Sequence, residues 1–414
     1  MSNARPLFSF WLLFPAVTMS LGWGLRGFIG GGPLGAMIPG AMVALAVALL
    51  LGRKTDLGWI AACGAVGVGF GGQMTYGQTV GLSFQPETFW WAITGFAIKG
   101  AAWGLLGGIV LGLGLTRATA RWHRRDVLAG LALMIAGTWA GWKLINAPKL
   151  IYFSNRLDQP REEMWAGMIV GALLLLGWMT LRGAGRVPQR FAVWGTVGGG
   201  AGFALGAAFQ ALGRQTGWTP WLDWWKVMEL TFGALLGAAY GWAAYRSRKV
   251  VPDGMEEQAR AIPLWMALGG AALLALIGIG LEYKLEIRIG YTVAGAVLLA
   301  AVMYSGALAW QTAVTVTACA FFIDLVENKE ILHGPQGWAL VGIGSLAVAW
   351  AVARRTDLRT LFLGLTWCAV GVSLAKVLLP PAALKLGSVS MEAAFVAMGA
   401  AATVWAVRLT RQSE

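Results

Sequence analysis

The stretch WWAITGFAIKGAAWGLLGGIVLGLGLTR, residues 90–117, decides the fold class of this chain. Between its Trp-Trp pair and Arg117 it carries a single charge, Lys99. About 20 apolar residues in an α-helix cross the roughly 30 Å of hydrocarbon in a bilayer, so this stretch is long enough to span a membrane. Similar apolar runs recur along all 414 residues. The sequence therefore predicts an integral membrane protein in a single membrane domain, residues 1–414.

The composition supports the same class. The chain is 57% hydrophobic and 12% charged, with a mean hydropathy of +0.65, whereas soluble domains are about 45–50% apolar and about 25% charged. The strands of a membrane barrel would appear as alternating segments of about ten residues rather than as unbroken apolar runs. We predict an all-α, polytopic transmembrane helical bundle. We read the apolar N-terminal run as a retained first helix, because no small-residue cleavage site follows it.

The net charge of +13 follows a topological pattern. Basic residues gather near residues 5, 53–56, 117–126, 182–190, 246–260, 354–359 and 408–414; these segments hold 19 basic and seven acidic residues and carry +12 of the total. Cytoplasmic loops of membrane proteins are enriched in Lys and Arg. The pattern predicts both termini in the cytoplasm, in a bacterial cytoplasmic (inner) membrane. It explains the charge without nucleic acid as a partner, and membrane lipids, including anionic lipid, are the expected contacts.

The basic segments divide the chain into similar helical hairpins. The predicted units are 7–53, 58–117, 127–182, 191–248, 262–309, 310–355 and 359–411. They give about twelve to fourteen transmembrane helices, because no basic residue marks an inner turn at 304–311 and two segments could merge there.

Two of these hairpins resemble each other closely. GAVGVGFGGQ from Gly64 aligns with GTVGGGAGFA from Gly195, and each is followed by a Trp-Trp pair and by glycines four residues apart. These glycine ladders are Gly100, Gly104 and Gly108 in one hairpin and Gly233, Gly237 and Gly241 in the other. We predict an internal duplication, which is common in secondary transporters; the alternative is that glycine-rich helices resemble one another through composition. Most of the 59 glycines are expected to allow close helix packing.

The segment GWGLRGFIGGGPLGAMIPG, residues 22–40, contains a G-x-G-x-x-G pattern. It lacks the strand and helix context of a dinucleotide site, so we do not read it as one. Instead its glycines predict a break between two membrane helices, with Arg26 in the break and Pro33 or Pro39 placed to start the next helix. A free helix N-terminus beside an arginine can bind an anion. The alternative is an ordinary outward turn with Arg26 among the lipid headgroups.

Polar residues concentrate in the outward half of the chain, where they predict either a polar vestibule or solvated helix ends. Lys99, Glu229 and Asp324 lie inside apolar helices, where a charge is costly and is expected to find a partner. Lys99 and Glu229 occupy neighbouring positions in the two similar hairpins, and if the hairpins pack about a pseudo-symmetry axis, these opposite charges can pair near its centre. The predicted substrate-binding residues are Arg26, Gln73, Tyr76, Lys99, Lys143, Glu229 and Asp324.

Several kinds of chemistry have no sequence signal. Only two histidines are present, no group of ligands has metal spacing, and we expect neither a metal nor a cofactor. The three cysteines lie in apolar runs and are expected to pack as small hydrophobes. A P-loop and a G-x-S-x-G elbow are missing, which argues against ATP-driven transport within the chain and against a serine hydrolase.

Three functions fit these features. The first is a secondary transporter or flippase for a polar, anionic or glycan-bearing substrate. The second is a membrane-embedded transferase or hydrolase acting on a lipid-linked substrate at the outer face, for which the acid pairs Glu162 with Glu163 and Glu327 with Glu330 are the candidates. The third is a structural or accessory subunit of a membrane complex. As partners, a second copy of the chain or the other subunits of such a complex are expected. We favour the transporter, because short loops leave little room for an enzyme's outer domain.

Overall fold

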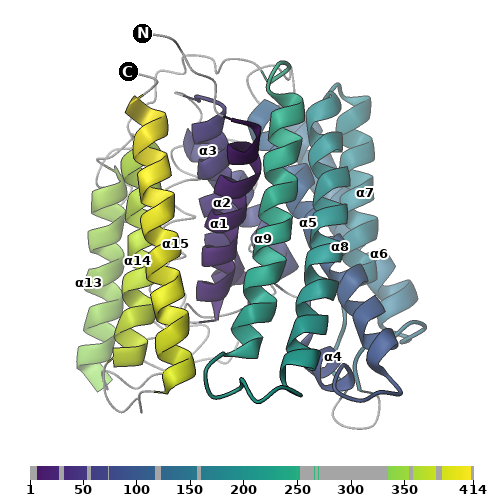
Figure 1. The fold of residues 1–414 in the computed structure, drawn as a ribbon. Helices are drawn as coiled ribbons and strands as arrows, with labels where there is room; N and C mark the ends of the chain where they lie inside the picture. Colours follow the sequence, from purple (N-terminus) through teal and green to yellow (C-terminus); the bar gives the residue numbers. More distant parts are fainter. Residues whose placement is uncertain are drawn as a thin grey trace.

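A computed structural model describes residues 7–27, 32–53, 57–72, 74–116, 123–155, 160–251, 265, 269, 334–353, 358–378 and 385–411. Within these ranges the regular structure is entirely helical (Figure 1). The helices are α1 (Phe8–Arg26), α2 (Gly32–Leu50), α3 (Leu57–Gly71), α4 (Gly77–Leu82), α5 (Phe89–Thr116), α6 (Arg124–Gly141), the π-helix η1 (Trp142–Asn146), α7 (Trp165–Leu181), α8 (Arg186–Gly213), α9 (Trp224–Ser247), α13 (Gly334–Ala353), α14 (Leu358–Leu378) and α15 (Leu386–Arg411).

Six helices of the described ranges are long and apolar enough to cross a bilayer: Phe8–Arg26, Phe89–Thr116, Arg125–Asn146, Arg186–Gly213, Trp224–Ser247 and Leu386–Thr410. The all-α class is thereby confirmed, and the long apolar helices fit a multi-pass membrane protein. The count of twelve to fourteen helices stays a prediction. The expected hairpin 262–309 and the uncertain joint at 304–311 lie outside the described residues, apart from two isolated positions in the hairpin.

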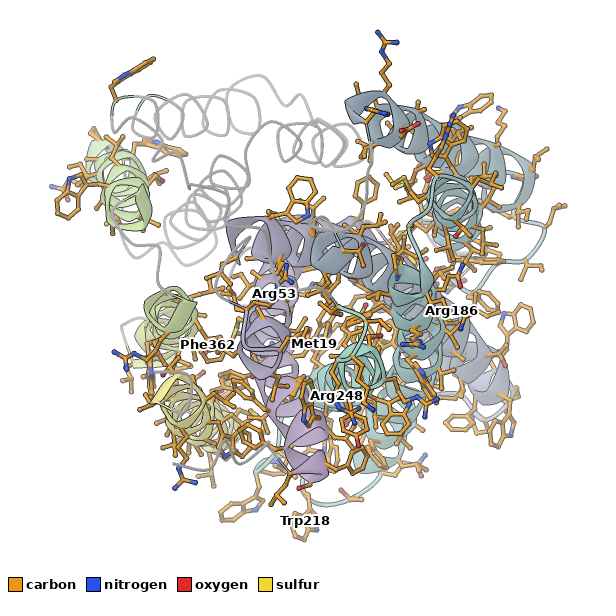
Figure 2. All side chains as sticks on the ribbon, turned by 90° about the horizontal axis from the view of Figure 1, so that it is seen from above. Met19, Arg53, Arg186, Trp218, Arg248 and Phe362 are labelled. Carbon is orange, nitrogen blue, oxygen red and sulfur yellow. The ribbon has the colours of Figure 1, made fainter. Side chains whose placement is uncertain are left out.

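The long helices run alternately up and down, so α1 begins at the same end of the bundle at which α9 and α15 end (Figure 1). Ring contacts fix this arrangement: Phe8 lies 5.4 Å from Trp242 of α9, and Phe10 lies 5.5 Å from Trp405 of α15. Basic residues gather at this end, which we call the basic end; Figure 2 looks down the bundle from above and labels Arg53, Arg186 and Arg248. That this end faces the cytoplasm, as the positive-inside rule would have it, stays a prediction.

The two glycine ladders are close-packing surfaces. Each glycine of the α5 ladder lies against the backbone of α8, and each glycine of the α9 ladder lies against the backbone of α1. A Cβ on Gly233, for example, would lie 2.7 Å from both the Met19 carbonyl oxygen and Ser20 Cα. Lipid offers little hydrophobic drive for helices to associate, so contact between backbones is what holds these pairs together. The duplication itself stays a prediction.

Aromatic side chains fill the space between α1, α5, α8 and α9. Trp23 packs edge-on against Phe232 and Trp103, with ring centroids 4.5 and 4.9 Å apart, and Phe203 stacks on Phe232 at 4.7 Å. All four are buried, and the Trp103 indole donates to the Val68 carbonyl of α3 at 2.6 Å. Such pairs stabilise by about 0.5–1.5 kcal/mol beyond the area they bury. This rigid aromatic cluster lies beside the charged residues described next.

Candidate functional site

The site begins where α1 ends. Arg26, the last residue of α1, is only 5% exposed. Its Nη1 donates to the Tyr76 hydroxyl at 2.7 Å, and its Nε and Nη2 donate to the Gly32 carbonyl, each at 3.3 Å. Gly32 begins α2 with a φ of +46°, a conformation that suits glycine. The guanidinium thus turns into the protein, and the expectation of an arginine among headgroups is wrong.

Aromatic rings surround this guanidinium. Its carbon lies 5.5 Å from the centroid of Trp103, 5.6 Å from that of Tyr76 and 5.7 Å from that of Trp23. A cation over aromatic faces gains about 0.5–2 kcal/mol, more where water is removed. The rings therefore compensate part of the lost hydration of a buried charge, and they hold the guanidinium in one orientation.

Tyr76 connects Arg26 to Glu229. It lies in the short segment between α3 and α4, its hydroxyl accepts from Arg26, and the Glu229 carboxylate is the charged group of opposite sign that acts on the same hydroxyl. The ring packs edge-on against Phe203 at 5.3 Å and lies tilted beside Trp225 at 5.8 Å. One hydroxyl therefore links a cation on α1 with an anion on α9.

Glu229 is 2% exposed and holds its own cation. Its carboxylate accepts from Lys226 Nζ at 2.8 Å, one turn earlier in α9, and from Trp225 Nε1 at 3.2 Å. Asp223 caps this helix by accepting from the amide of Trp225 at 2.9 Å, which fixes the first turn. Lys226 also reaches the end of α1, since a Cβ on Gly27 would lie 2.9 Å from its Nζ.

Arg26, Tyr76, Lys226 and Glu229 form what we call the Arg26 cluster. It holds two cations and one carboxylate from two membrane helices, joined through a tyrosine from a third segment. At about 1.5 Å per residue, Glu229 lies about 8 Å along α9 from its start, at the end of the bundle opposite the basic end (Figure 1). A carboxylate paired with one cation, and a second buried cation bonded to the neighbouring tyrosine, can exchange one counter-ion for another.

Lys99 does not belong to this cluster. Its Nζ donates to Glu163 Oε1 and Thr79 Oγ1, both at 2.7 Å, and to the Thr75 carbonyl at 2.9 Å. The predicted pair of Lys99 with Glu229 is therefore wrong. The predicted repeat gives the two residues neighbouring positions on their own helices, but the two side chains meet different neighbours. The expectation that buried charges find partners is confirmed for both.

Glu163 completes this second ion pair. Its Oε1 accepts from Ser154 Oγ at 2.9 Å and its Oε2 from the Phe153 amide at 3.1 Å. The Lys99–Glu163 pair is 1% and 0% exposed at its side chains. With every partner satisfied, it acts as a structural pin: it fixes the carbonyl of Thr75 and thereby positions the neighbouring Tyr76.

The remaining predicted residues lie elsewhere. Lys143 is exposed in η1, and Gln73 and Asp324 lie outside the described residues. Of the acid pair offered for enzymatic catalysis, Glu162 is exposed whereas Glu163 is buried in the structural pin, so these two do not present paired carboxylates to one substrate. The pair Glu327 with Glu330 lies outside the described residues.

Sequence reasoning missed Lys226, although its place three residues before Glu229 on a helix was a usable signal. It also missed Glu392, a lone acid inside the apolar run of α15. Among the described residues no group of three or more His, Cys, Asp or Glu side chains could hold a metal ion.

Comparison of the chain with protein-family models, curated proteins and solved structures gives no match. Its function is therefore argued from the site.

Proposed function

We propose that this protein is a secondary transporter or flippase for a polar, anionic or glycan-bearing substrate, and that the Arg26 cluster binds the anionic group of that substrate. The observation that carries the proposal is that two buried cations and one buried carboxylate lie near the end of α1 beside a partly buried tyrosine, with Arg26 bonded to Tyr76 and Lys226 bonded to Glu229. Ionisable residues inside membrane segments are costly and are retained mainly where they serve a pathway or a site.

The chemistry of the cluster favours an anion. Arg26 offers a planar fork of donors that suits a carboxylate or a phosphate, and Lys226 adds a compact second cation. Glu229 is then the internal counter-ion of the empty site. An arriving anion can take over the hydrogen bonds from Lys226, and Glu229 becomes free to accept a proton or to move. Removing either partner alone would leave an uncompensated buried charge, which is why the exchange is coupled.

The aromatic neighbours favour a substrate that also carries a ring. Trp225 is half-buried, and its indole faces the ring of Tyr76. Sugar rings stack on such faces through their C–H groups, and the rigid aromatic cluster beneath fixes the position of the stack. A glycan that carries a carboxylate or a phosphate fits both halves of the site.

Transport is tested with purified protein in liposomes. Solid-supported-membrane currents report charge movement on addition of inorganic phosphate, sulfate, succinate or glucuronate, and a fluorescent anionic lipid reports flipping in the same vesicles. We expect at least one probe to move with the wild-type protein, and Arg26→Ala and Glu229→Gln to abolish that movement. Lys143→Ala is the matched control: it removes a predicted but exposed cation and should leave transport unchanged.

The outcomes separate the three functions. Equal transport in the Arg26→Ala variant and the wild type would refute the assignment of the site. Turnover of a lipid-linked substrate in detergent micelles, where no second compartment exists, would favour the enzyme. Copurification with one fixed partner in mild detergent, without movement of any probe, would favour the structural subunit.

A further inference from the structure

A third buried acid lies beside the Arg26 cluster. Glu392 of α15 is 5% exposed, and it lies about 9 Å along its helix from the start. The Ser373 hydroxyl of α14, itself fully buried, donates to its Oε1 at 2.5 Å. The other oxygen, Oε2, is buried and has no hydrogen-bond partner among the residues that the structure describes. A polar oxygen in this state costs free energy unless something binds it.

The other two buried carboxylates of the described helices and loops are fully engaged. Glu163 has a salt bridge to Lys99, and Glu229 has one to Lys226. Glu392 has no salt bridge within the part of the chain that the structure describes, and its one donor is a neutral hydroxyl. Burying an ionised carboxylate without a paired cation is strongly unfavourable, and such a group takes up a proton instead.

The neighbours of Glu392 are largely apolar. Met391 and Phe395, close to it on α15, belong to one buried cluster with Leu25 of α1, Ile38 of α2 and Val370 of α14. The cation that acts on Glu392 through its charge is Lys226 of α9, which itself binds Glu229. Lys226 thus binds Glu229 directly and acts on Glu392 only through its charge.

We propose that Glu392 is the site at which the coupling proton binds, and that the protein moves its anion together with a proton. This inference rests on the proposed transport function. In the binding step a hydronium ion transfers its proton to Oε2, an O–H bond forms, and water is left. Oε1 remains the carbonyl oxygen and keeps the hydrogen bond from Ser373.

Protonation changes the charge balance of the site. With Glu229 and Glu392 ionised, two anions balance Arg26 and Lys226, and the group is neutral. With Glu392 protonated, the same group carries one net positive charge, which an anionic substrate neutralises. Proton and anion therefore favour each other's binding, and by linkage the effect is reciprocal.

Infrared difference spectra of the purified protein, recorded between acidic and alkaline pH, test the proton site without any substrate. Each variant's spectrum is subtracted from that of the wild type, because the other carboxyl groups of the chain also give carbonyl bands. We expect one carbonyl band of a protonated carboxylic acid that the wild type and Glu229→Gln share and that Glu392→Gln lacks. Ser373→Ala keeps the acid but removes the hydrogen bond to Oε1, so this band should remain and move to higher frequency. Identical carbonyl bands in the wild type and Glu392→Gln, or a band that does not move in Ser373→Ala, overturn the inference.

The same variants in liposomes separate this inference from the transport proposal. With the anion that gives a current, a proton gradient should drive uptake in the wild type and in Lys143→Ala but not in Glu392→Gln. If the band behaves as expected but no anion moves with the wild type, the proton site stands and transport is refuted. If anion uptake in Glu392→Gln still follows the proton gradient, the coupling role is refuted while transport stands.

Discussion

Gly233→Ala tests the helix contact on which the site depends. Gly233 lies one turn after Glu229 on the face of α9 that packs against α1. An added Cβ would lie 2.7 Å from the Met19 carbonyl oxygen and from Ser20 Cα, whereas ordinary contacts begin at 3.4 Å. Both of these atoms belong to the backbone of α1, so no side-chain rotation relieves the clash. The two helices must separate by about 0.7 Å, which is the difference between those distances.

The separation has two expected effects. Overpacking of this kind typically lowers the free energy of unfolding by about 1–3 kcal/mol, and here it also strains the hydrogen bond from Ser20 Oγ to the Leu230 carbonyl, 2.9 Å long. It moves Glu229 away from Arg26 and Tyr76, so transport should fall as well. We expect a loss of stability within that range, together with reduced transport in liposomes.

The assay is unfolding in mixed micelles of a mild detergent and sodium dodecyl sulfate, followed by tryptophan fluorescence. Gly177→Ala is the matched control, because Gly177 is helical and exposed and a Cβ there would meet nothing within 4 Å. Replacing glycine by alanine inside a helix favours the helix by up to about 1 kcal/mol, so this control should be neutral or slightly stabilised. If Gly233→Ala unfolds like Gly177→Ala, the described contact between α1 and α9 is incorrect.

Two further predictions concern the structural pin and the topology. Lys99→Met should lower the free energy of unfolding by about 3–5 kcal/mol, because it leaves Glu163 buried without a cation. In a double-mutant cycle, the variant that also carries Glu163→Gln should lose less free energy of unfolding than the sum of the two single losses. Strict additivity would show that the two residues are not coupled. In a variant that lacks the native cysteines, an impermeant maleimide applied to intact cells should label Thr216→Cys but not Lys249→Cys, and the reverse pattern would place the basic end outside.

Much of the fold could be predicted from the sequence, because a bilayer imposes a simple rule. Every backbone polar group in hydrocarbon must be satisfied within its own segment, so long apolar runs have to be helices. The glycine ladders likewise predicted close packing. The helices that pack against these ladders could not be predicted in the same way. The spacing of glycines along one helix shows that one of its faces lacks side chains, whereas the helix that packs on that face is decided by the arrangement of the whole bundle.

The site was predicted in part. Arg26 and Glu229 could be identified from the sequence because each is a charge among apolar residues, and the structure places both near Tyr76. Lys143 was chosen only because it lies in the outward half, a property that it shares with many surface residues. Lys99 is buried as expected but pairs with Glu163, because neighbouring positions in two similar hairpins do not determine which residue a helix face meets.

A cryo-electron-microscopy map of the protein in lipid nanodiscs, with the most active anion of the panel at saturating concentration, tests the central claim most directly. The proposal predicts added density between Arg26 and Lys226, beside the ring of Trp225, and its loss in a map of Arg26→Ala. Added density confined to exposed cations such as Lys143 or Arg214, with the Arg26–Tyr76–Glu229 contacts unchanged, would contradict it.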